Sequence, residues 1–84
     1  MKIFLTSKAK KQFKKLPFQM RILLGNSITS LTKNPMPPNS KKLAGRQGWR
    51  IRIGDHRILY TFDKKELTIL SLSHRRDAYR LFLF

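Results

Sequence analysis

The chain has 84 residues, of which nineteen are Lys or Arg and four are Asp or Glu, giving a formal net charge of +15 at pH 7. This length fits one hydrophobic core, so we expect a single domain over residues 1–84. Hydrophobic residues make up 40% of the chain, too many for a disordered basic tail. The absence of cysteine excludes disulfides, thiolate metal sites and a cysteine nucleophile. The charge favours a polyanionic partner, together with an acidic protein partner that would stabilise the chain.

No segment of the sequence suits an export signal or a membrane. The apolar stretch at residues 3–5 is too short for the core of a signal peptide. The longest apolar runs elsewhere, residues 22–24 and 81–84, fall far short of the roughly 20 residues that span a bilayer. We therefore expect a cytoplasmic protein.

The first half of the chain predicts a short strand followed by two helices. Residues 2–6 suit the strand, and Ser7 suits the N-cap of the first helix, because its hydroxyl can accept from a free helix N–H. Pro17 separates this helix from the second and favours its first turn. Apolar residues at helical spacing are Ala9, Phe13 and Leu16 in the first helix, and Met20, Leu23, Leu24, Ile28 and Leu31 in the second. The two helices are predicted to form an antiparallel hairpin.

The second half alternates between apolar and polar residues, as strands do. The segments 49–53 and 56–62 flank Gly54-Asp55, which fits a two-residue hairpin turn with Gly54 at positive φ. A second turn at residues 63–66 leads to a further strand at 67–73. The layout is β-α-α-β-β-β plus a C-terminal helix or strand. It predicts an α+β fold in which the N-terminal strand and two-helix hairpin pack on one face of a mainly antiparallel sheet.

The two-residue turn determines which side chains face each other in the hairpin. The expected pairs are Ile53 with His56, Arg52 with Arg57, Ile51 with Ile58, Arg50 with Leu59, and Trp49 with Tyr60. Three arginines then lie on the face turned away from the helices, and the two strands that carry them contain no carboxylate. Like charges that face each other in this way destabilise a sheet. Such a conflict is typical of a functional site, and phosphate resolves it because guanidinium binds its oxygens bidentately. A solvated face that provides solubility is the simpler alternative.

The arginine face is also expected to hold leucines. Leu59, Leu70 and Leu72 lie there if residues 63–66 form a four-residue loop. Either the C-terminal residues 81–84 or a partner helix would cover these leucines. The arginines would then lie at the edge of a covered groove.

Two segments resemble a known family. The hairpin reads W-R-I-R-I-G-D-H-R-I-L-Y over residues 49–60, and the tail reads H-R-R-D-A-Y over residues 74–79. Together they resemble the RelE/ParE superfamily of bacterial toxins, and look most like its RelE branch, the ribosome-dependent mRNA interferases. The likeness covers essentially the whole chain, including the N-terminal helices and the approach to the sheet at residues 42–45.

The resemblance implies a toxin of a type II toxin–antitoxin system. Its activity would be endoribonucleolytic, cleaving mRNA in the ribosomal A site by attack of a ribose 2′-OH on the adjacent phosphate, without a metal or other cofactor. Its partners would be the ribosome, mRNA and a cognate antitoxin, which we expect to be acidic and to cover the basic groove.

The resemblance also carries the family's functional positions onto this chain. The basic residues of the family's hairpin match Arg50, Arg52 and Arg57, and its C-terminal arginine and tyrosine match Arg75 and Tyr79. We expect Arg57 and Arg75 to stabilise negative charge in the transition state. Arg50 and Arg52 would do the same or lower the pKa of the 2′-OH, and Tyr79 would stack on a base or orient the ribose.

The general base is a separate question, because many RelE proteins carry lysine where this chain has Arg50 and Arg52. A guanidinium stays protonated and is a poor base. We favour His74, which lies in the tail motif and, by strand parity, on the arginine face, where neighbouring cations lower the pKa of an imidazole. His56 is the second candidate, against the alternative of a solvated turn residue.

Further RNA contacts are expected around the site. The candidates are Lys41, Lys42 and Arg46, placed in a loop before the hairpin, together with Trp49, His56 and Arg76. Simpler roles compete for some residues: Trp49 and Tyr60 suit the hydrophobic core, and Tyr79 suits an anchor for the C-terminal segment.

Two other functions compete with the nuclease. A ParE-like inhibitor of DNA gyrase shares the fold but generally lacks the nuclease residues, so the matched arginines and Tyr79 argue against it. A non-catalytic basic RNA-binding module explains the charge, but not the convergence of arginines on one sheet face.

Overall fold

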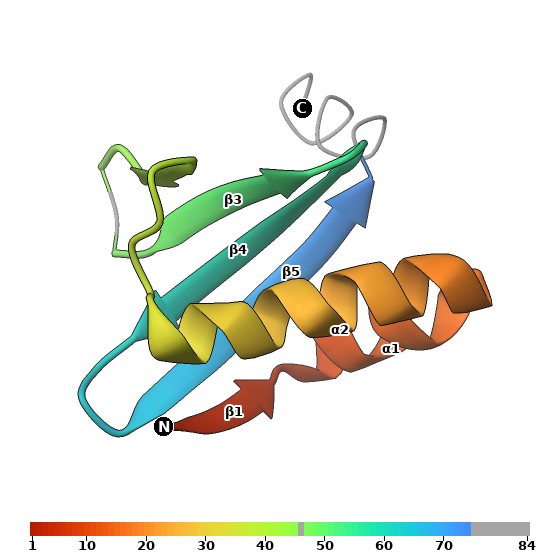
Figure 1. The fold of residues 1–84 in the computed structure, drawn as a ribbon, viewed down its shortest axis with the longest axis horizontal. Coiled ribbons are helices and arrows are strands. Elements are labelled where there is room, and N and C mark those ends of the chain that lie inside the picture. The colour runs from red at the N-terminus through yellow and green to blue at the C-terminus, as the bar shows by residue number, and fades with distance from the viewer. Residues whose placement is uncertain (46, 75–84) are drawn as a thin grey trace.

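The computed structural model describes residues 1–45 and 47–74. The elements in this part of the chain are β1 (Lys2–Leu5), α1 (Ser7–Lys15), α2 (Phe18–Lys33), β2 (Ser40–Lys42), β3 (Trp49–Ile53), β4 (His56–Phe62) and β5 (Glu66–His74). The strands form one sheet in the order β1-β5-β4-β3-β2 (Figure 1). β1 runs parallel to β5, and the other neighbours are antiparallel. The predicted α+β class is confirmed.

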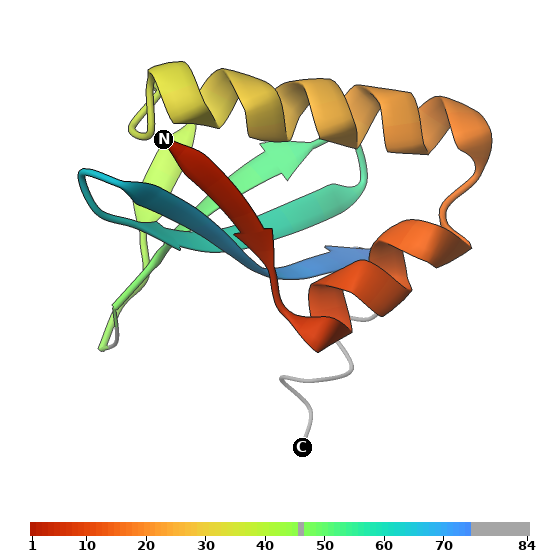
Figure 2. The same cartoon turned by 90° about the horizontal axis from the view of Figure 1, so that it is seen from below.

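The hydrophobic core lies between the helices and one face of the sheet. α2 crosses this face and α1 lies beside β5 (Figure 2). Buried residues from both helices and from β3, β4 and β5 form one cluster: Ala9, Leu24, Ile28, Leu31, Ile51, Ile58, Tyr60, Leu67, Ile69 and Leu72. Neither helix in the described part of the chain has the length and apolarity needed to cross a bilayer.

Helix α2 buries fewer apolar side chains than their spacing in the sequence predicts. Leu24, Ile28 and Leu31 follow at i, i+4 and i+7 and are buried, and Met20 packs against the same cluster. Leu23 is 45% exposed, so its predicted place on the buried face is wrong. The reason is geometric, because Leu23 lies one residue, or about 100° of helix rotation, from Leu24.

The start of α1 is tied to β5, the strand that neighbours β1 in the sheet. Thr6, not the predicted Ser7, is the N-cap, and its Oγ1 accepts from the backbone N–H of Ala9 at 3.1 Å. The same hydroxyl donates to the carbonyl of Leu70 in β5 at 2.8 Å. The Thr6 side chain therefore caps the helix and also bonds to β5, directly after Leu5, where β1 ends.

A bulge at Leu70 changes the parity of β5. Tyr60 pairs with Ile69 but Leu59 pairs with Ser71, so Leu70 is one extra residue on β5. Beyond the bulge, Leu72 pairs with Ile58 on the helix face and is 2% exposed. The predicted position of Leu72 on the arginine face is therefore wrong, and the bulge is the physical reason.

Candidate functional site

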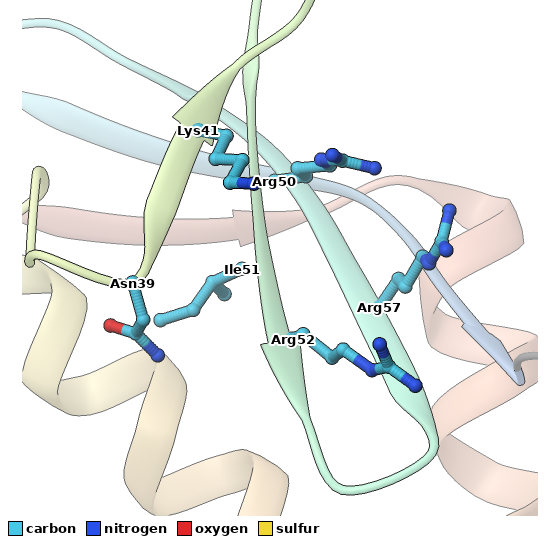
Figure 3. Close-up of a pocket in the computed structure, with 6 residues that line it drawn as sticks. All are labelled: Asn39, Lys41, Arg50, Ile51, Arg52 and Arg57. Atoms are coloured by element: carbon cyan, nitrogen blue, oxygen red, sulfur yellow. The ribbon is translucent and has the colours of Figure 1, made fainter.

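The site lies where β2, β3 and β4 run side by side. A cavity of about 140 Å³ is lined by Asn39, Lys41, Arg50, Ile51, Arg52 and Arg57. Figure 3 shows the three arginine side chains extending to the same side of the hairpin, with Lys41 reaching towards Arg50 from the neighbouring strand. The sequences of β2, β3 and β4 contain no Asp or Glu. The cavity is therefore strongly positively charged.

The hairpin has the predicted register. Arg52 pairs with Arg57, Arg50 with Leu59 and Ile53 with His56. Gly54 adopts a φ of 60°, as a primed two-residue turn requires of its first residue. Because residues opposite each other share a face of the sheet, this turn places all three arginines on the face opposite the helices.

A short strand that the sequence did not reveal adds a fourth cation. Residues expected in a loop form β2, in which Lys41 pairs with Arg50 and Lys42 pairs with Trp49. Lys41 therefore joins the arginine face, and Lys42 belongs to the opposite face. Asn39, in the turn before β2, also lines the cavity and was not anticipated. The hint in the sequence was its position two residues before Lys41.

The position of β2 depends on a buried tyrosine. Tyr60 is fully buried, as its core alternative predicted, and its hydroxyl donates to the carbonyl of Pro35 at 2.7 Å. Burial raises the pKa of Tyr60 above its ordinary 10.0, and a hydrogen bond with Ser40 opposes this in part. Ser40 in turn donates to the carbonyl of Pro37 through its Oγ at 2.7 Å. These bonds fix the segment that carries Asn39 and Lys41.

The other end of β2 is closed by Gly48. The backbone N–H of Leu43 donates to the carbonyl of Gly48 at 3.0 Å. Gly48 has a φ of 130°, and an added Cβ would lie 3.0 Å from Cδ1 of Leu43 and 3.3 Å from the carbonyl oxygen of Tyr60. Only glycine fits this close approach without displacing its neighbours.

Both histidines lie on the helix face, away from the arginines. His56 pairs with His74 across β4 and β5, and their rings meet edge to face with centroids 5.1 Å apart. His56 is 8% exposed, which also excludes the solvated turn residue. The predicted position of His74 on the arginine face is wrong, because the bulge at Leu70 reverses the parity on which that prediction rested.

Trp49 also lies on the helix face. Its ring centroid is 6.1 Å from that of Phe62, and the side chain packs against the core cluster. This placement matches the core alternative rather than RNA stacking. Several predicted positions lie outside the described residues: Arg46, Arg75, Arg76, Tyr79, and residues 81–84, which were expected to cover the leucines of the arginine face.

Comparison with known protein families gives a match over most of the chain. The model of the ParE toxin of type II toxin–antitoxin systems (parDE) matches residues 3–79. None of the curated proteins compared with the chain matches it.

Solved structures similar to this chain include toxins and toxin–antitoxin complexes. The complex RelBE2 from Mycobacterium tuberculosis matches with a TM-score of 0.73 and 25% identity, over 88% of this chain and 96% of that one. The RelE–RelB complex from Pyrococcus horikoshii has a TM-score of 0.77 and 24% identity, over 88% and 93%. The isolated RelE toxin of Escherichia coli has a TM-score of 0.76 and 18% identity, over 98% and 94%.

The family match and the fold agree with the resemblance of the hairpin and tail motifs. The chain belongs to the ParE toxin family of type II toxin–antitoxin systems, within the RelE/ParE superfamily.

Proposed function

We propose that this toxin is a RelE-type endoribonuclease that cleaves mRNA in the ribosomal A site. The observation that carries the proposal is the cavity formed by Lys41, Arg50, Arg52 and Arg57 on three adjacent strands without a carboxylate. A sheet face of this kind suits a phosphodiester, because each guanidinium offers two parallel N–H donors to phosphate oxygens.

The reaction requires negative charge to be stabilised as it develops. In the proposed step the ribose 2′-oxygen forms a bond to phosphorus, and the bond from phosphorus to the 5′-oxygen of the next nucleotide breaks. The products are a 2′,3′-cyclic phosphate and a 5′-hydroxyl. Negative charge grows on the phosphate oxygens, so cations already fixed around them lower the barrier. The hairpin register sets Arg52 directly opposite Arg57, and this opposition supports the role proposed for the two guanidiniums.

The proton of the 2′-OH leaves without a histidine base in this proposal. Both His56 and His74 lie on the other face of the sheet, and the arginines are poor bases. The cationic cavity instead lowers the pKa of the 2′-OH, so that water accepts its proton, and the departing 5′-oxygen takes a proton from water. Arg50 and Arg52 serve this purpose. Arg75 and Tyr79 are assigned to the reaction only by their match to the family's C-terminal positions.

The proposed partners follow from charge and from the related structures. A net charge of +15 favours an acidic antitoxin. Two of the similar structures are complexes, the toxin–antitoxin complex RelBE2 and the archaeal RelE–RelB complex, which supports a cognate antitoxin as the partner. The substrate is ribosome-bound mRNA, which places the activity in the cytoplasm.

Inhibition of DNA gyrase is the second candidate, because the matching family model carries the name ParE. The two functions are distinguished by assaying the purified toxin for cleavage of mRNA on programmed ribosomes and for inhibition of gyrase supercoiling. Cleavage on ribosomes with unaffected gyrase supports the nuclease. Inhibited supercoiling with intact mRNA supports the ParE function.

A further inference from the structure

The cations of the cavity fall into two cross-strand pairs. Arg52 of β3 is directly opposite Arg57 of β4, and Arg50 of β3 is directly opposite Lys41 of β2. Opposed residues in neighbouring strands have side chains close enough to converge on one group. Each pair can therefore hold one anion of its own.

The two pairs are displaced from each other along and across the sheet. Arg50 and Arg52 are two residues apart on β3, which corresponds to about 6.7 Å along the strand. The pairs also lie on opposite sides of β3, and adjacent strands are separated by about 4.8 Å. This separation suits two consecutive phosphates of an extended single strand better than it suits one phosphate. A positively charged groove that follows the backbone is how proteins bind single-stranded nucleic acid.

We propose that Lys41, with Arg50, forms a second phosphate site next to the one where cleavage takes place. The ligand class is single-stranded RNA with two adjacent phosphates, running across the sheet from β4 to β2. This inference rests on the proposed ribonuclease function, and it specifies the path of the RNA strand across the sheet. Lys41 binds as a compact point charge, and the guanidinium of Arg50 supplies paired N–H donors.

The structure holds this second site rigidly. The turn before β2 is fixed by the bond from the Tyr60 hydroxyl to Pro35 and by the bond from Ser40 Oγ to Pro37, both at 2.7 Å. The end of β2 is fixed by the 3.0 Å bond from Leu43 to Gly48. A fixed backbone means that Lys41 loses less conformational freedom on binding than a lysine in an open loop would.

The chain supplies a matched control for Lys41. Lys42, which the sequence also offered as an RNA contact, is the next residue on the same strand and is also exposed. It pairs with Trp49 on the opposite face of the sheet and does not line the cavity, so it serves as the control. Lys41→Ala and Lys42→Ala therefore remove the same charge from neighbouring positions. A difference between them reports which face binds RNA, while a general effect of net charge is common to both.

The test is a binding titration with oligonucleotides that cannot be cleaved because every 2′-OH is methylated, carrying one, two or three phosphates. For the wild-type toxin the second phosphate should raise affinity roughly tenfold and steepen the salt dependence by about 0.7 in log K against log salt. Lys41→Ala should lose both gains, Lys41→Arg should keep most of them, and Lys42→Ala should keep both.

Two results would overturn the second site. One is equal wild-type affinity for ligands with one and two phosphates, and the other is an equal loss for Lys41→Ala and Lys42→Ala. Because the ligands are not cleaved, the titration gives an answer whether or not the toxin is a nuclease. If the second phosphate raises affinity but the toxin leaves mRNA on ribosomes uncut, the result counts against the proposed function and not against the second phosphate site.

Discussion

Arg52 of β3 stands directly opposite Arg57 of β4, on the face of the sheet turned away from the helices. Two guanidiniums in opposed positions repel each other. An anion bound between them would lower this repulsion. The relationship links the stability of the hairpin to the chemistry that we propose for it.

Replacing Arg52 should separate activity from stability. Arg52 is exposed, so Arg52→Ala removes charge repulsion without opening a cavity. We expect cleavage on ribosomes to fall by about a hundredfold, the scale of losing one donor to a developing negative charge. The melting temperature should stay level or rise. Cleavage rates and thermal melts of the same preparation measure both effects.

Arg21 on α2 is the control for this change. It is exposed on the helix side and lies 5.9 Å from the centroid of the Phe18 ring. Arg21→Ala removes one positive charge and should leave cleavage within about twofold, because long-range fields are screened at physiological salt. Equal losses for the two variants would contradict a specific role of Arg52.

Two glycines in different backbone conformations should respond in opposite ways to substitution by alanine. Gly54 has a φ of 60°, a conformation that a side chain disfavours, so Gly54→Ala should destabilise the fold by about 1 kcal/mol. Gly25 lies inside α2, and an added Cβ meets nothing within 4 Å. Gly25→Ala should therefore stabilise the fold by about 0.5–1 kcal/mol. Urea unfolding of both variants tests the pair, and a stabilised Gly54→Ala would contradict the assigned turn.

The hairpin is the part of the fold that the sequence predicts best. Gly54-Asp55 between two alternating segments leaves one register, and all five predicted pairs from Trp49–Tyr60 to Ile53–His56 are confirmed. Local chemistry suffices there, because a two-residue turn determines the alignment of its own strands.

The errors arise where contacts distant in sequence decide the structure. Nothing in residues 66–74 marks a bulge, since no glycine or proline interrupts the strand. The bulge at Leu70 coincides with the bond from the Thr6 hydroxyl, 64 residues away, and it moves both Leu72 and His74 to the helix face. The same holds for β2, whose three polar residues carry no strand pattern and pair only because β3 offers an open edge.

Tyr60→Phe tests the anchor of the β2 segment. The substitution removes the hydroxyl that donates to the Pro35 carbonyl and keeps the buried ring. The loss should cost about 1–2 kcal/mol of unfolding free energy. It should also weaken the second-phosphate binding assigned to Lys41 more than cleavage itself. Urea unfolding and the oligonucleotide titration measure the two effects, and unchanged stability would argue against the anchor.

The same tyrosine predicts a pH dependence. Its pKa in the folded chain is raised above 10.0 by burial, so the folded state keeps the phenol proton more firmly than the unfolded state. The stability that this contributes is present below pH 10.0 and is lost as pH rises through the folded pKa. The wild type should therefore lose stability above about pH 10 more steeply than Tyr60→Phe. Parallel slopes of the two proteins would contradict the assignment.

The turn between β4 and β5 has an acid-sensitive cap. Asp63 Oδ1 accepts from the backbone N–H groups of Lys65 at 2.7 Å and Glu66 at 2.8 Å, and these bonds lower its pKa below 3.8. Stability from the carboxylate is present above pH 3.8 and is lost as pH falls through the lowered pKa. Asp63→Asn should be less stable than wild type at pH 7, with the difference shrinking in acid. A difference that does not vary with pH would exclude this role.

The most direct test of the central claim is primer extension on ribosomes programmed with a defined mRNA, comparing the wild type with Arg57→Ala, Tyr79→Ala and Arg21→Ala. We expect cuts within the A-site codon that require the ribosome, that are lost in Arg57→Ala and Tyr79→Ala, and that persist in Arg21→Ala. Intact mRNA with the wild-type toxin, or undiminished cutting by Arg57→Ala, would contradict the claim that the arginine face of this sheet is a ribonuclease site.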